Sequence, residues 1–168
     1  MIDWLSSKVA ISIAVLILVS SVAGFMALQR ESALDDEVRR HAEMAANWID
    51  SFGSLGGESE AMMSIGEGGM YCLPSSVGGE PVYLNLSMGV VRLRCGARIA
   101  SASYIAEVHL WEPKGTNYTW EEIDASDAQH PWTGWLGAGD AVIFERIFVS
   151  ISGSWVLITF AYHQKMAA

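Results

Sequence analysis

The pattern of apolar and polar positions divides the chain into an N-terminal helical part and a C-terminal β-rich part. Residues 9–28 contain no charged side chain, and a helix of that length spans roughly 30 Å, the thickness of a bilayer's hydrocarbon core. Residues 30–52 contain no Pro or Gly and repeat apolar residues at intervals of three and four, which predicts an amphipathic helix. Its apolar stripe comprises Leu34, Val38, Ala42, Ala45, Trp48, Ile49 and Phe52.

The simplest prediction is one helix that runs through both segments and ends before Gly53, a typical helix stop. Two compatible interpretations of the stripe remain open. The stripe packs on the protein's own domain, or it packs on copies of itself in a bundle or filament. The heptad pattern is too short to establish a coiled coil.

From residue 81 onward, apolar residues alternate with polar ones, as they do in half-buried strands. Two longer β-branched and aromatic runs, residues 141–151 and 155–163, flank a Ser-Gly-Ser turn and predict an antiparallel hairpin with a strand near the centre of a sheet. Residues 115–139 are polar and aromatic, and we expect a long loop there. About five or six strands are expected, enough for a sheet or a small sandwich.

The expected fold class is therefore α+β, in which a long N-terminal transmembrane and amphipathic helix precedes an antiparallel β-sheet or small β-sandwich. The expected divisions are an anchor and helical stalk over residues 1–53, a Gly-rich connection over 54–80, and an extracytoplasmic β-rich domain over 81–168.

The charge and the motifs of the chain exclude several classes of function. The chain has 168 residues, with 10 Lys and Arg against 19 Asp and Glu, a net charge of -9. An acidic chain repels phosphate backbones, so we expect no nucleic-acid partner. No phosphate-binding loop, nucleophile motif or metal-ligand spacing is present, so we expect no enzymatic activity, no cofactor and no metal. Histidines 109 and 163 alternate with core positions and are expected at the surface.

Three tryptophans in the aromatic segment 111–135 suggest a site that binds a glycan or a protein. The side chains of Trp120, Trp132 and Trp135 could form a platform for a glycan or a protein, because aromatic side chains dominate binding hot spots. The alternative is that they pack over the sheet.

Two interpretations fit the apolar segment itself. A cleaved signal peptide would use Ser21-Val22-Ala23 as its cleavage site. A retained anchor is favoured, because the apolar run continues past Ala23 and its N-terminal flank is weakly basic. The membrane is therefore an expected partner.

Three features bear on which side of the membrane the β-rich domain occupies. Arginines 30, 39 and 40 follow the apolar segment and argue mildly for the cytoplasmic side. Against that, Asn85 and Asn117 each begin an N-x-[ST] glycosylation sequon. In addition, Cys72 and Cys95 permit one disulfide, worth about 3 kcal/mol in an oxidising compartment, although two buried reduced thiols are the alternative. We expect the domain outside.

The order of these parts resembles the type IV pilin-like superfamily, which includes archaeal pilins and archaellins. The resemblance is carried by the segment from Lys8 to Leu28, by its continuation AEMAANWIDSF, and by the stretch LPSSVGGEPVY that begins at Leu73. It implies that the N-terminal helix anchors in the membrane or a filament core. It also implies that the β-domain faces outside, that sequons there are glycosylated, and that the partners are further copies or other pilin-like subunits.

One motif differs from the family's pattern. Prepilins carry a basic residue and Gly just before the apolar run, whereas this chain has Ser6-Ser7-Lys8, and it also has no Glu early in the run. These two differences favour a minor pilin or an unprocessed accessory protein, either on the cell membrane as a single-pass protein or in an extracellular filament.

Overall fold

A computed structural model describes the backbone of residues 2–165 and the side chains of Val9 and residues 11–164. Contacts divide the chain into two units, Met1–Asp36 and Glu37–Ala168. The long helix α1 (Ile2–Gly53) contributes to both units. The last residue of the helix, Gly53, lies so close to Ala106 that a Cβ added at Gly53 would be 2.5 Å from the Ala106 Cβ. The predicted helix and its glycine stop are confirmed.

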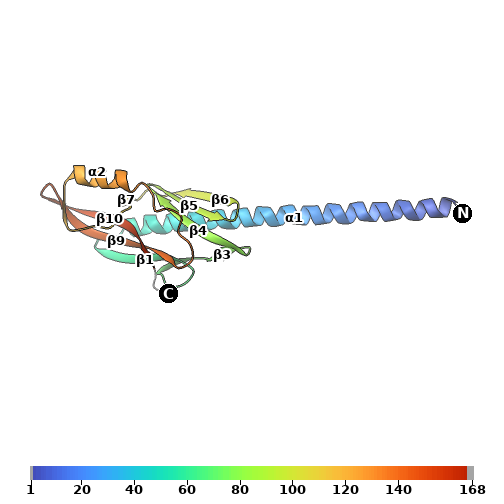
Figure 1. The fold of residues 1–168 in the computed structure, drawn as a ribbon, viewed down its shortest axis with the longest axis horizontal. Coiled ribbons are helices and arrows are strands. Elements are labelled where there is room, and N and C mark those ends of the chain that lie inside the picture. Colours follow the sequence, from blue (N-terminus) through green and yellow to red (C-terminus); the bar gives the residue numbers. More distant parts are fainter. Residues whose placement is uncertain (1, 166–168) are drawn as a thin grey trace. The chain divides into compact units, whose positions relative to one another are not determined.

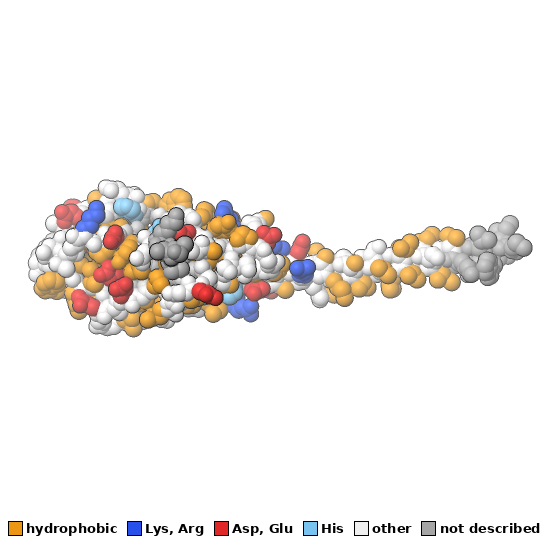
Figure 2. Space-filling model, turned by 60° about the horizontal axis from the view of Figure 1, so that its bottom comes forward, with side chains coloured by type: hydrophobic (Ala, Val, Ile, Leu, Met, Phe, Trp, Pro, Cys, Tyr) orange, Lys and Arg blue, Asp and Glu red, His pale blue; other side chains and the backbone are white. Residues whose placement is uncertain are grey.

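The first unit is a helix with an uncovered apolar surface. Every described side chain from Val9 to Leu28 is exposed, and Figure 2 shows hydrophobic side chains along this part of α1. The side chain of Lys8 lies outside the described residues. Within the described residues, α1 is the one helix that is long and apolar enough to cross a membrane.

The second unit contains two β-sheets and a short helix, α2 (Trp120–Gln129) (Figure 1). The six-stranded sheet comprises β1 (Ser59–Ile65), β2 (Tyr71–Leu73), β7 (Val108–His109), β8 (Asn117–Tyr118), β9 (Asp140–Ile151) and β10 (Ser154–Lys165). The four-stranded sheet comprises β3 (Ser76–Val77), β4 (Glu80–Ser87), β5 (Val90–Cys95) and β6 (Arg98–Ser103).

The predicted α+β class is confirmed, although the larger of the two sheets is mixed rather than wholly antiparallel. In the six-stranded sheet the order is β2-β1-β9-β10-β7, and β8 adds to β9. Strand β9 runs antiparallel to β1 and β10, whereas the β1–β2, β7–β10 and β8–β9 pairs are parallel. The four-stranded sheet is antiparallel in the order β3-β4-β5-β6.

The predicted hairpin is confirmed as β9 and β10, two inner strands of the larger sheet. Their register pairs Ile151 with Ser154, which leaves a two-residue turn. Ser152 and Gly153 have φ values of 50° and 88°. Positive φ at both positions is typical of the turn that matches the twist of a hairpin.

The C-terminal part of α1 packs on its own domain, which confirms one of the two interpretations of the apolar stripe. From Val38 onward, every stripe residue is buried except Trp48, which is half-buried. The Trp48 ring stacks on Phe52 and Tyr71, with centroids 5.6 and 5.4 Å away, and meets Phe144 of β9 edge-on at 5.1 Å. The remaining stripe residue, Leu34, belongs to the first unit.

The expectation that residues 54–80 form only a Gly-rich connection is wrong. This segment contains β1, β2 and β3, and β1 pairs along its length with β9. The burial of β1 does not alternate, because Met63, Ser64 and Ile65 are all buried. The alternation that identifies a half-buried strand is therefore absent from the end of β1. The described strands number ten, whereas five or six were expected. The β-rich domain accordingly begins before residue 81.

Candidate functional site

Helix α2 lies in the segment that the sequence analysis assigned to a loop, and that assignment is wrong. Thr119 and Glu122 begin the helix as a capping box. The Thr119 Oγ1 atom accepts a hydrogen bond from the Glu122 amide at 3.2 Å, and a Glu122 carboxylate oxygen accepts one from the Thr119 amide at 2.8 Å. The sequence Thr-Trp-Glu-Glu carries this signal, but the surrounding polar and aromatic residues obscured it.

The Asp127 carboxylate fastens α2 to the sheet beneath it. It accepts hydrogen bonds from the indole Nε1 of Trp111 at 2.9 Å and from the Nδ1 of His109 at 2.9 Å. The helix also buries Ile123 in an apolar cluster with the residues Trp111, Val149, Ile151, Ile158 and Phe160. These contacts give α2 a fixed position.

The placement of His109 corrects the expectation of a surface residue. Its side chain is only 5% exposed and lies 5.7 Å, centroid to centroid, from the ring of Phe160. Its other ring nitrogen is 3.9 Å from the exposed carboxylate of Glu107. His163 does lie at the surface, where its Nε2 contacts Asp140 at 3.1 Å. A pattern of alternating positions could not reveal the contact between His109 and Asp127, because Asp127 lies on a different element.

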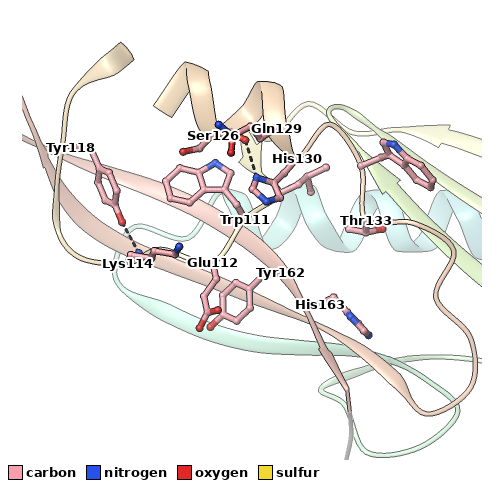
Figure 3. A pocket seen from close by; sticks show the side chains of 12 residues that line it. Trp111, Glu112, Lys114, Tyr118, Ser126, Gln129, His130, Thr133, Tyr162 and His163 are labelled. Atoms are coloured by element: carbon pink, nitrogen blue, oxygen red, sulfur yellow. Dashed lines mark hydrogen bonds between the residues drawn. The ribbon is translucent and has the colours of Figure 1, made fainter. Parts of the chain in front are cut away.

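A cleft of about 470 Å³ lies between α2, the segment 110–114 and the C-terminal half of β10 (Figure 3). Ligand sites in proteins have volumes of this order. Its apolar walls include Trp111, which is buried, and Trp132, which is 54% exposed. Polar side chains from α2, the 110–114 segment and β10 also line it, among them Glu112, Lys114, Ser126, Gln129, His130 and Tyr162.

Tyr162 remains neutral in this cleft at physiological pH. Burial and the nearby Glu145 carboxylate raise the pKa of Tyr162 to about 12. Its hydroxyl donates a hydrogen bond to a Glu145 carboxylate oxygen at 3.2 Å. Glu112, also a lining residue, adds a smaller repulsion toward the tyrosinate form. Tyr162 therefore acts in the cleft as a neutral phenol.

The three tryptophans of the predicted platform have different surroundings. Trp132 lines the cleft, whereas Trp120 lines a separate cavity of about 220 Å³ together with Arg146 and Thr159. Trp135 lies under the guanidinium of Arg94, 4.8 Å from carbon to ring centroid. Of these three, only Trp132 remains a candidate for ligand contact in the cleft. Trp111, which the sequence analysis did not single out, contributes a buried wall.

The two glycosylation candidates differ in accessibility. Asn85 is 3% exposed, and its amide donates to the Gly134 carbonyl at 2.9 Å while its oxygen accepts from Arg92 at 3.3 Å. A glycan cannot be attached to a side chain buried in this way, so Asn85 is wrong as a candidate in the folded protein. Asn117 is exposed in the short strand β8 and remains a predicted acceptor.

The predicted bridge between Cys72 and Cys95 is wrong, because both are free thiols. Exposed Cys72 lies on β2 of the larger sheet, and buried Cys95 lies on β5 of the smaller sheet. The hydrogen bond from the Ser64 hydroxyl at 3.5 Å lowers the pKa of Cys72. The Cys95 thiol donates to the Val77 carbonyl at 3.3 Å. The alternative of two buried, reduced thiols is correct for Cys95. Cys72 is also reduced, but it is exposed.

The described residues include no group of three His, Cys, Asp or Glu side chains placed to hold a metal ion. Comparison with models of protein families, with characterised proteins and with solved structures finds no match to the chain.

Proposed function

We propose that the protein is a non-enzymatic, pilin-like subunit or accessory protein. In this proposal the N-terminal part of α1 anchors in a membrane or in the core of a filament, and the β-rich unit faces outside. The observation that carries the proposal is the contrast within α1. Its described side chains from Val9 to Leu28 are all exposed, whereas Val38, Ala42, Ala45, Ile49 and Phe52 are buried in the second unit.

The exposed apolar surface supports a role in lipid or in helix packing. Twelve large side chains between Val9 and Leu28 are each 47–67% exposed. Removing a large apolar side chain from water stabilises by on the order of 1 kcal/mol or more. A bilayer removes the whole surface, and neighbouring helices in a filament core do so equally well. Small residues allow such helices to approach closely, and Gly24 lies within this exposed part of α1.

The β-rich unit supports the second half of the proposal, because it has a core of its own. The ring cluster of Trp48, Phe52 and Phe144 joins α1 to the larger sheet within this unit. The unit therefore needs no help from the apolar segment to bury its apolar side chains. A self-contained domain attached to an apolar helix is the arrangement that the resemblance to pilins implies.

Membrane fractionation with intact-mass analysis tests the anchor. The full chain should remain in the membrane pellet after extraction at alkaline pH, and protease added to intact cells should digest the β-rich unit. The mass should include residues 1–23, because a cleaved signal peptide would have lost them. Replacing Leu16 and Leu18 by Lys should release the protein, whereas the same change at exposed Ser152 and Ser154 should not. Recovery of the unaltered chain in the soluble fraction would reject the anchor.

A second candidate function is a membrane-tethered module that binds a glycan or a protein, and the cleft beside α2 favours it. The segment 111–135 contributes many of its lining residues, and these combine aromatic faces with polar groups. Replacing Trp132, the one platform residue that lines the cleft, should weaken binding and leave the fold intact. Unchanged binding would reject this candidate without affecting the proposal of an anchored subunit.

A further inference from the structure

The cleft beside α2 has a rigid wall and an accessible wall, both aromatic. Trp111 is 7% exposed, and its indole nitrogen is held by Asp127 at 2.9 Å, so the ring cannot turn away. Trp132 is 54% exposed and presents its ring to solvent. Its backbone is held by a β-bridge to Ser87. Aromatic faces are electron-rich and attract C–H groups that carry partial positive charge, such as those on one face of a sugar ring.

The polar groups of the cleft include acceptors and donors that the protein leaves available. The Nδ1 of His130 lies 3.0 Å from the carbonyl oxygen of Ser126. Because a carbonyl only accepts, Nδ1 carries the hydrogen and Nε2 of the neutral ring is an acceptor. Among the residues that the structure describes, the side chains of Glu112 and Gln129 have no hydrogen-bond partner. A hydroxyl group can both donate and accept, so it suits this mixture.

Charge favours a neutral ligand over an ion. The cleft has one acidic residue, Glu112, and one basic residue, Lys114, so its formal charge sums to zero when the histidines are neutral. Tyr162 carries no charge at physiological pH, for the reasons given above. The chain as a whole has a net charge of -9, which repels anions. The net charge of the cleft therefore favours neither an anionic nor a cationic ligand.

We propose that this cleft binds a neutral sugar residue of a glycan, with Trp132 stacking on the ring and Glu112, Gln129 and His130 contacting its hydroxyl groups. The volume of about 470 Å³ accommodates one or two such residues. This inference rests on the second candidate function, in which the β-rich unit is a binding module. It does not depend on assembly through α1.

Saturation-transfer NMR on the full chain in lipid nanodiscs tests the inference. The probes are glucose, galactose, mannose and N-acetylglucosamine, together with the charged analogues glucuronate and glucosamine. We expect transfer to at least one neutral sugar and weaker transfer to its charged analogue. Trp132→Ala should weaken binding by about tenfold, the loss typical of a central aromatic contact. Trp155→Ala is the matched control, because Trp155 is 65% exposed and lies outside the cleft.

Three results would overturn the inference: no transfer to any sugar, stronger binding of a charged analogue, or equal binding by Trp132→Ala and the unaltered chain. Gln129→Ala, an exposed change on α2, provides a second variant that should also weaken binding. A mixture of random hexapeptides is run in parallel. Transfer to peptides but not to sugars keeps the binding module and rejects the sugar, and transfer to neither rejects both.

Discussion

The Nδ1 atom of His109 lies 2.9 Å from a carboxylate oxygen of Asp127, and this contact joins strand β7 to helix α2. The same carboxylate accepts a hydrogen bond from Trp111 Nε1 at 2.9 Å. Both donors belong to buried side chains, which are 5% and 7% exposed. One surface helix residue therefore satisfies two buried nitrogen atoms and holds one wall of the cleft.

Replacing Asp127 by Ala should lower the free energy of unfolding by about 2–6 kcal/mol, since two buried donors lose their partner and each costs about 1–3 kcal/mol. Asp127→Asn retains one acceptor and should cause an intermediate loss. Urea denaturation followed by tryptophan fluorescence measures both. Asp124→Ala on the same helix is the control, because Asp124 is exposed. Equal stability of the Asp127→Ala and Asp124→Ala proteins would contradict this role.

The two cysteines should differ in reactivity. Iodoacetamide at neutral pH should label Cys72 in the native protein and reach Cys95 only after denaturation, because Cys72 is exposed and Cys95 is buried. Ser64→Ala should slow the labelling of Cys72, since the Ser64 hydrogen bond lowers the pKa of that thiol and favours the reactive thiolate. Intact mass gives the number of labels. A protein that takes no label until a reductant is added would show that the disulfide forms.

Glycan occupancy should be confined to Asn117. In a glycosylating host, Asn117→Gln should remove the added mass, because the Asn117 side chain is exposed. Asn85→Gln should leave the glycan in place and lower stability, since the longer amide cannot keep the bonds to Gly134 and Arg92. Peptide mass spectrometry locates the modification. A glycan found on Asn85 would contradict the buried position described here.

Stability should fall between about pH 10 and 12, partly because of Tyr104. Burial raises the pKa of Tyr104 to about 12, and its hydroxyl donates to the Ser87 carbonyl at 2.7 Å. An unfolded tyrosine has a pKa near 10. Below pH 10 both states keep the proton, so this residue adds no pH dependence. Above pH 10 the unfolded state loses the proton first, and stability declines by up to about 1.4 kcal/mol per pH unit.

Tyr104→Phe should make this alkaline decline shallower, while Tyr71 and Tyr162, whose pKa values are also raised, maintain part of it. Urea midpoints measured at intervals from pH 9 to pH 11.5 give the slope for each protein. Identical slopes for the variant and the unaltered chain would show that Tyr104 ionises in the folded state as readily as in the unfolded state.

The sequence predicted those parts of the fold whose signal lies in one segment. The apolar run has its length without a charge, the helical stripe has its spacing of three and four, and the β9–β10 hairpin has two β-branched runs around a short turn, and all three are present. Strand β1 was missed because both of its faces are covered at its C-terminal end, so Met63, Ser64 and Ile65 are consecutively buried. A strand buried on both faces lacks alternation.

The candidate site was less predictable, because it depends on contacts between distant segments. Asp127 meets His109 and Trp111 only after α2 folds over the sheet. The capping box at Thr119 was the one local signal for that helix. Similarly, the positions of the sequons and the cysteines in the sequence say nothing about which of them are buried. The structure distinguishes Asn85 from Asn117 and Cys72 from Cys95 through the strands that carry them.

If the protein is a pilin-like subunit, as we propose, the apolar part of α1 packs against other helices in an assembly. Photo-cross-linking from single positions tests it most directly. A benzophenone amino acid is placed at Leu16 or Phe25, both at least 60% exposed, in the full chain in native membranes. An unrelated single-pass protein with the same probe controls for random collisions. We expect a ladder of dimers and larger products that the control lacks. Monomers cross-linked only to lipid at both positions would contradict it.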